Sequence, residues 1–153
     1  MSMSRRTIVK ALATGGALFG ASVLMPRLAM AALSEKAFTA KDQAGAMDAL
    51  LGSNQLEQSA DVTLKAPYIA ENGAVVPVTV RSKMANVESI SIFVENNPNP
   101  LVAEFMVPAG TAADVSTRLR MGKSSTVTAV VKADGKLYSA SKEVKVTIGG
   151  CGG

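Results

Sequence analysis

From residue 62 onward the sequence alternates apolar and polar residues with a period of two. Successive side chains of a β-strand point to opposite faces, so this alternation is typical of an antiparallel sheet with one buried face. The apolar positions form short runs: Val62 and Leu64; Val76, Val78 and Val80; Ile90, Ile92 and Val94; Leu101, Ala103, Phe105 and Val107; Val115, Leu119 and Met121; Val127, Ala129 and Val131; Val144, Val146 and Ile148. Such runs predict an all-β, immunoglobulin-like antiparallel β-sandwich over residues 61–148.

Turn-forming residues separate these runs. Asn72-Gly73 and Asp134-Gly135 favour tight hairpins with positive φ. The segment 97–100 reads Asn-Pro-Asn-Pro and cannot continue a ladder. Pro77 has no N–H, which predicts that its strand lies at a sheet edge or begins at a bulge. Phe93 interrupts the polar face of its run.

Residues 32–60 are expected to form a short helix and a linker ahead of the sandwich. Thr39 is a suitable cap for a helix over residues 39–51, Asp42 suits its first turn, and Gly52 ends it. The polar segment 53–60 is interpreted as the linker.

The first 31 residues have the pattern of a signal peptide. Arg5 and Arg6 precede an uncharged stretch, and a small-x-small cleavage site ends at Ala31. The paired arginines indicate the twin-arginine type, which resembles the signals of proteins exported already folded, so a co-folded partner or a cofactor is suggested. The alternative is a membrane anchor, but the apolar run is shorter than the roughly 20 residues that span a bilayer. We therefore expect a periplasmic protein with no membrane attachment after cleavage.

Charge and composition exclude several classes of function. Four of the 16 Lys and Arg residues and none of the 12 Asp and Glu residues lie in the predicted signal, so the remaining chain carries 12 of each. A neutral domain has no electrostatic footprint for nucleic acid. The chain contains no histidine, the commonest general base and metal ligand, so we predict no catalytic residue, no metal site and no cofactor.

Cys151 is the single cysteine and the predicted functional residue. It lies between Gly149-Gly150 and Gly152-Gly153, and glycine permits conformations closed to other residues. The thiol can therefore move about 10 Å beyond Ile148 on a flexible tail. A glycine-rich terminus can be without function, but an exposed thiol is a liability in an oxidising compartment. We predict that Cys151 is a covalent attachment point for substrate.

The local sequence offers this thiol no nearby cation, helix N-terminus or metal, which are the features that activate thiols. We expect an unactivated thiol until another protein's site receives the tail. Ordering the five residues 149–153 costs about 5–10 kcal/mol, which favours weak and reversible docking.

The signal, the valine-rich β domain and the Gly-Gly-Cys-Gly-Gly tail together resemble the SoxY family of sulfur carriers in the periplasmic Sox thiosulfate-oxidising system. The segments Ile69–Val78 and Asn97–Val102 also resemble that family, and the pentapeptide is the most specific part. The resemblance implies a partner subunit of the SoxZ type and sulfur intermediates carried on Cys151. It further implies that SoxAX, a haem enzyme, joins thiosulfate to this thiol, that SoxB releases sulfate, and that SoxCD, where present, oxidises the remaining sulfur. The carrier itself is then not an enzyme.

Two other interpretations remain open from the residues. The chain is alternatively an exported immunoglobulin-like binding or structural module whose Cys151 only forms intermolecular disulfides, for instance in a dimer. A thiol-dependent sulfurtransferase is the third interpretation, and nothing in the sequence favours it. Glu71, Asn97 and Asn99 are possible partner contacts, but turn formation explains each of them more simply.

Overall fold

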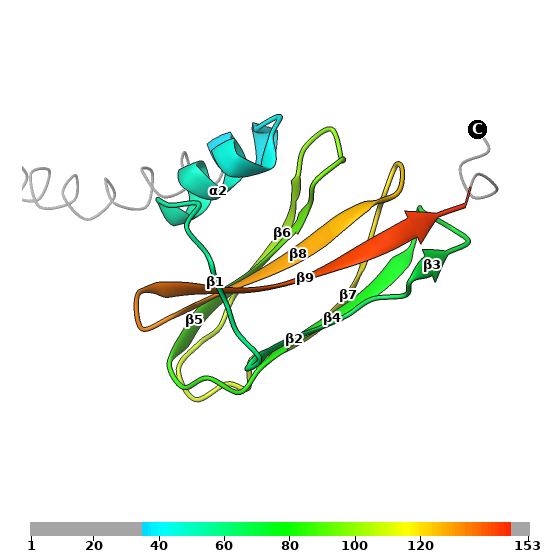
Figure 1. The fold of residues 1–153 in the computed structure, drawn as a ribbon. Helices are drawn as coiled ribbons and strands as arrows, with labels where there is room; N and C mark the ends of the chain where they lie inside the picture. The colour runs from blue at the N-terminus through cyan, green and yellow to red at the C-terminus, as the bar shows by residue number, and fades with distance from the viewer. Residues whose placement is uncertain (1–34, 148–153) are drawn as a thin grey trace, which may run out of the picture. The chain divides into compact units, whose positions relative to one another are not determined.

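The computed structural model of the chain describes residues 35–147, and within them the fold consists of two β-sheets and a helical segment (Figure 1). A six-stranded sheet has the order β1-β9-β8-β5-β6, with β3 also paired to β9, and a three-stranded sheet has the order β2-β4-β7. The strands are β1 Glu57–Gln58, β2 Val62–Lys65, β3 Ile69–Ala70, β4 Val76–Ser82, β5 Val87–Val94, β6 Leu101–Met106, β7 Asp114–Leu119, β8 Ser125–Ala133 and β9 Lys136–Val146. The prediction of an all-β, immunoglobulin-like sandwich is confirmed.

The main core lies between the two sheets and is built from the predicted alternating positions. Its fully buried members include Val78 and Val80 of β4, Ile90 and Ile92 of β5, and Val131 of β8. Each such side chain contributes about 1.5–3 kcal/mol when it leaves water. Aliphatic burial therefore dominates the joining of the sheets, with Phe105 and Tyr138 packed against the cluster.

A second core lies on the other face of the six-stranded sheet, against helix α2 (Gln43–Leu51). Ala46 and Met47 of the helix pack in one cluster with Phe93, Leu101 and Val130. This second core explains why Phe93 interrupts the polar face of β5, since that face is also buried. The helix thus belongs to the same folded body as the sandwich.

Helix α2 begins later than predicted, and Thr39 is not its cap. Asp42 is the N-cap, with an extended backbone (φ −132°, ψ 155°) and a carboxylate that accepts the Gly45 N–H at 2.7 Å. Thr39 instead lies in a preceding helical stretch over residues 35–39, where its hydroxyl donates to the Lys36 carbonyl at 3.2 Å. Gly52 ends the helix with φ 74°, as predicted.

Strand β9 is longer than the sequence pattern indicated. It spans 11 residues, whereas the alternation predicted only its last part. Its outer edge is covered near both ends, because β1 pairs in parallel with it at Tyr138 and β3 at Lys145. Covering an edge strand limits pairing with other chains.

The Asp134-Gly135 hairpin between β8 and β9 is confirmed, with φ values of 49° and 71°. The prediction of a tight hairpin at Asn72-Gly73 is wrong. This turn connects β3 and β4, which belong to different sheets, and Gly73 is not among the positive-φ residues of the described chain.

Pro77 predicted that its strand lies at a sheet edge, and this prediction is wrong, since β4 is the central strand of the smaller sheet. Pro77 itself pairs only with Arg118 of β7, and the ladder with β2 begins two residues later, at Thr79. The missing N–H is tolerated because β2 does not extend to that position.

Candidate functional site

The predicted attachment residue Cys151, its neighbours Gly149, Gly150, Gly152 and Gly153, and the export residues Arg5 and Arg6 lie outside the described residues. What the structure describes is the place from which the tail departs. We call Lys145, Val146 and Thr147 the tail root. Figure 1 shows β9 ending beside β3, so the root lies next to that short strand.

The tail root is held by hydrogen bonds on both sides. On the outer side, the Lys145 N–H donates to the Tyr68 carbonyl at 2.8 Å and the Thr147 N–H donates to the Ala70 carbonyl at 3.1 Å. On the inner side, the Ser124 hydroxyl accepts the Val146 N–H at 2.9 Å. The backbone is therefore fixed up to Thr147, four residues before Cys151.

Gly73 packs against the root, and this close approach explains why a glycine stands there. A Cβ at this position would lie 2.5 Å from the carbonyl oxygen of Met121 and 2.8 Å from Cγ1 of Val146. The Gly73 carbonyl also accepts the Met121 N–H at 2.7 Å. The glycine thus lets three segments meet at the end of the sandwich, a role that its φ angle alone does not reveal.

Apolar side chains are exposed around the root. Tyr68 and Ile69 are each 54% exposed and Val75 is 49% exposed, all in the segment that passes the end of β9. The Lys145 ammonium lies 5.0 Å from the centre of the Tyr68 ring, a cation–π contact. Two neighbours raise the pKa of Lys145, first the Tyr68 side chain and then the carboxylate of Glu143. This lysine is therefore cationic at neutral pH.

A pocket of about 540 Å³ lies at the same end of the sandwich. Asn97 shapes it, donating to the Arg120 carbonyl at 2.7 Å and accepting the Gly122 N–H at 3.2 Å. These bonds join the Asn97 side chain to the β7–β8 connection, while its own N–H donates to the Val94 carbonyl at 3.1 Å within a turn. Arg118 and Arg120 line the pocket, and neither forms a salt bridge within residues 35–147. Their charges favour anions at this end.

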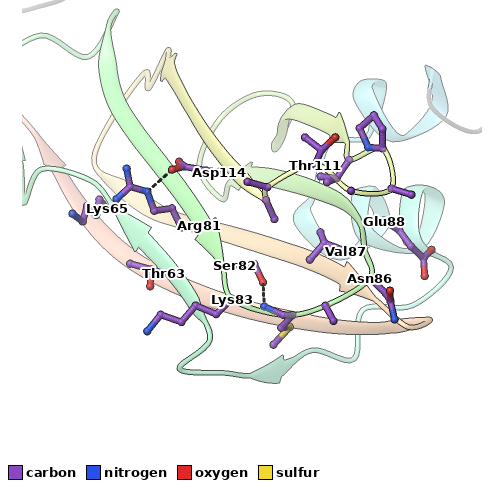
Figure 2. A pocket seen from close by; sticks show the side chains of 18 residues that line it. Thr63, Lys65, Arg81, Ser82, Lys83, Asn86, Val87, Glu88, Thr111 and Asp114 are labelled. Atoms are coloured by element: carbon purple, nitrogen blue, oxygen red, sulfur yellow. Dashed lines mark hydrogen bonds and ion pairs between the residues drawn. The ribbon is translucent and has the colours of Figure 1, made fainter.

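A larger pocket, of about 890 Å³, lies at the other end of β7 (Figure 2). The ion pair between Arg81 and Asp114 (2.7 Å) crosses its wall, and at about half exposure such a pair contributes at most about 1 kcal/mol. The Gly135 N–H, and after it Lys132, lowers the pKa of Glu88 by hydrogen bonding. The Glu88 contacts hold the β8–β9 hairpin, and the Arg81–Asp114 pair joins β4 to β7. Lys65 and Lys83 also line this pocket, and neither forms a salt bridge within residues 35–147.

The described residues form neither a metal-binding cluster nor a membrane-spanning helix. None of their His, Cys, Asp and Glu side chains gather in threes suited to a metal ion. Across residues 35–147, no helix is long and apolar enough to cross a bilayer.

Three comparisons relate the chain to known proteins. The family model described as sulfur oxidation protein SoxY matches residues 47–151, a span that includes Cys151. The solved structure of the sulfur carrier protein SoxY from Chlorobium limicola f thiosulfatophilum is 47% identical, with a TM-score of 0.64, and the match covers 74% of this chain and 98% of that one. The curated protein sequences gave no significant match.

Two further solved structures are only distantly similar. A chain from a structure concerning T cell activation by the bacterial superantigen toxic shock syndrome toxin-1 is 10% identical with a TM-score of 0.41, and covers 56% of this chain and 99% of that one. An engineered protein is 16% identical with a TM-score of 0.40, and covers 58% of this chain and 21% of that one. Neither adds to the argument.

Proposed function

Because this chain belongs to the SoxY family of sulfur carriers, we propose that it holds the sulfur intermediates of thiosulfate oxidation covalently on the thiol of Cys151. The observation that carries the proposal is the family match, which extends through the sandwich to Cys151. This cysteine is the only thiol in the chain, so a sulfur carrier role that uses a thiol has no other residue available.

The tail root supports this role. Hydrogen bonds donated by the backbone to Tyr68, Ala70 and Ser124 hold the chain up to Thr147, and the residues beyond include four glycines around Cys151. We propose that the sandwich holds the base of the tail in place and that residues 149–153 carry the thiol to other proteins. Arg118 and Arg120 suit the anionic charge of such cargo.

The chemistry is proposed to belong to partner enzymes, with this chain as their substrate. Thiosulfate and the Cys151 thiol combine to a cysteine S-thiosulfonate and one proton, and the two electrons released pass to the haem enzyme SoxAX. Water then cleaves the terminal S–S bond in SoxB, which leaves a persulfide on the cysteine and releases sulfate. SoxCD, where present, oxidises that remaining sulfur.

Membership of the family implies the Sox system and, in general, a SoxZ partner. We propose a stable complex with a SoxZ-type subunit and transient docking to the three enzymes. Transient docking follows from the cost of ordering the tail, about 5–10 kcal/mol, which each encounter must offset.

Intact-mass spectrometry of the chain, purified without reductant from cells oxidising thiosulfate, tests the carrier role. We expect species heavier by one sulfur or by a thiosulfonate group, which a thiol reductant removes and which proteolysis assigns to the peptide containing Cys151. If the only modified species were disulfide-linked dimers, the chain would instead be a binding or structural module.

We also propose that residues 1–31 are a twin-arginine signal and that the mature protein works in the periplasm. Within residues 32–60, the segment expected to be a linker supplies strand β1, so it is part of the sandwich and the boundary at residue 61 is too late. The joint substitution Arg5→Lys and Arg6→Lys should leave nearly all of the chain in the cytoplasm, because this export route reads the arginine pair. Immunoblots of periplasmic and cytoplasmic fractions measure the effect. Equal periplasmic amounts of the wild type and the variant would contradict this assignment.

A further inference from the structure

The exposed apolar side chains beside the tail root are not explained by the fold. Tyr68, Ile69 and Val75, which we call the root patch, are each about half exposed, so the sandwich gains only part of the burial that these side chains offer. Tyr68 and Ile69 lie against Lys145 through the β3–β9 pairing, and Val75 follows the turn that places Gly73 against Val146. The patch thus borders the point where the tail departs.

The length of the tail restricts which surfaces meet when the thiol is used. Cys151 is four residues beyond Thr147, so its Cα lies at most about 14 Å from that of Thr147. Strand β3 is adjacent to β9, at a spacing of roughly 4.8 Å. Because the tail reaches at most about 14 Å, a protein with a recessed active site must bring the mouth of that site close to the root in order to receive the thiol. The surface around the mouth then lies next to the root patch, which borders the root.

We propose that the root patch of Tyr68, Ile69 and Val75 is the docking surface for the haem enzyme that loads Cys151, which would present an apolar rim around the mouth of a channel that admits the tail. The inference rests on the proposed function. It assigns the recognition of that enzyme to side chains of the sandwich in addition to the tail.

The chain supplies a matched control for this assignment. Met106 is the most exposed of the large apolar residues described, at 67%, but it lies at the far end of β6. Strand β6 starts at Leu101, next to the Asn97 turn that bonds to Arg120 and Gly122, and runs away from that end of the sandwich. A general effect of surface apolarity would therefore appear at Met106 as well, whereas docking at the root would not.

The test compares Ile69→Ser, Val75→Ser and Met106→Ser in the full mature chain. The first measurement is the kcat/KM with which the purified haem enzyme joins thiosulfate to Cys151. We expect a fall of about five- to tenfold, carried by KM, for Ile69→Ser and Val75→Ser, and less than about twofold for Met106→Ser. The second measurement is the rate at which iodoacetamide labels Cys151, which should be the same in all variants because a small reagent needs no docking.

The outcomes separate the two proposals. If the wild type is loaded with thiosulfate and the three variants are loaded equally well, the docking surface is wrong while the carrier role stands. If the wild type is never loaded, the carrier role fails and the docking surface with it. Val75 lies outside the strands, so Val75→Ser reports on docking even if Ile69→Ser disturbs the short β3 ladder.

Discussion

The substitution Cys151→Ser is expected to abolish sulfur carriage completely. A hydroxyl cannot form the S–S bond on which the cargo rides, and the chain contains no second cysteine to replace the first. Intact-mass spectra of the variant from thiosulfate-oxidising cells should show a single unmodified species. Cells that have only this variant should not oxidise thiosulfate.

A second variant tests whether sulfur carriage requires only an exposed thiol or a thiol at the position of Cys151. The double substitution Cys151→Ser with Met106→Cys restores one exposed thiol, but on a strand instead of the tail. It should react with iodoacetamide and still fail to acquire sulfur from the partner enzymes. Thiosulfonate adducts on either variant at wild-type levels would contradict the proposed attachment site.

The substitution Gly73→Ala should have the largest effect on stability, lowering the free energy of unfolding by about 3 kcal/mol. The added methyl group would meet the Met121 carbonyl oxygen at 2.5 Å and Val146 Cγ1 at 2.8 Å. The first neighbour is backbone, so it cannot turn aside as a flexible side chain would. Relief requires that the segment move away from β9 or from Met121. Urea unfolding, followed by circular dichroism, should show a lower midpoint at an unchanged slope.

The matched control for this prediction is Gly122→Ala. Gly122 lies in the neighbouring connection between β7 and β8, has no positive φ, and an added Cβ there would meet nothing within 4 Å. Its substitution should change the free energy of unfolding by less than about 0.5 kcal/mol. Equal urea midpoints for the two variants would show that the end of the sandwich accommodates a side chain at position 73.

The sequence pattern predicted the strands whose core residues alternate, and it failed where burial follows another rule. The first half of β9 contains Ser139 and Ser141, which give no apolar period, and it is a strand because β8 pairs with it along its whole length. Strands β1 and β3 have two residues each and exist only through pairing with β9. Such pairing is a property of the tertiary structure.

The helix cap shows the limit of local signals. Thr39 and Asp42 are both good capping residues, so the sequence pattern alone did not determine which of them begins helix α2. The backbone settles the choice, because Asp42 is extended and its carboxylate reaches the Gly45 N–H.

In the candidate site, too, some residues could be identified from the sequence and others only from the tertiary structure. Cys151 and its glycines could be singled out from the sequence because they are the single thiol and a distinctive pentapeptide. The surface beside the tail could not, since Ile69 is far from Lys145 in the chain and is brought next to it only by a two-residue parallel ladder. The role of Gly73 was hidden for the same reason, because its close contacts come from Met121 and Val146.

The hydrogen bonds that fix the tail root also set the effective concentration of the thiol. With the chain anchored at Thr147, the Cys151 thiol can reach at most a hemisphere of about 14 Å radius, which corresponds to about 0.3 M for a docked enzyme. If the bonds that Tyr68, Ala70 and Ser124 accept were lost and three more residues became free, the accessible volume would grow about fivefold and the effective concentration would fall by that factor. Under the proposed carrier function, a few backbone hydrogen bonds at the end of β9 would thus keep the thiol at a high effective concentration for a weakly bound enzyme.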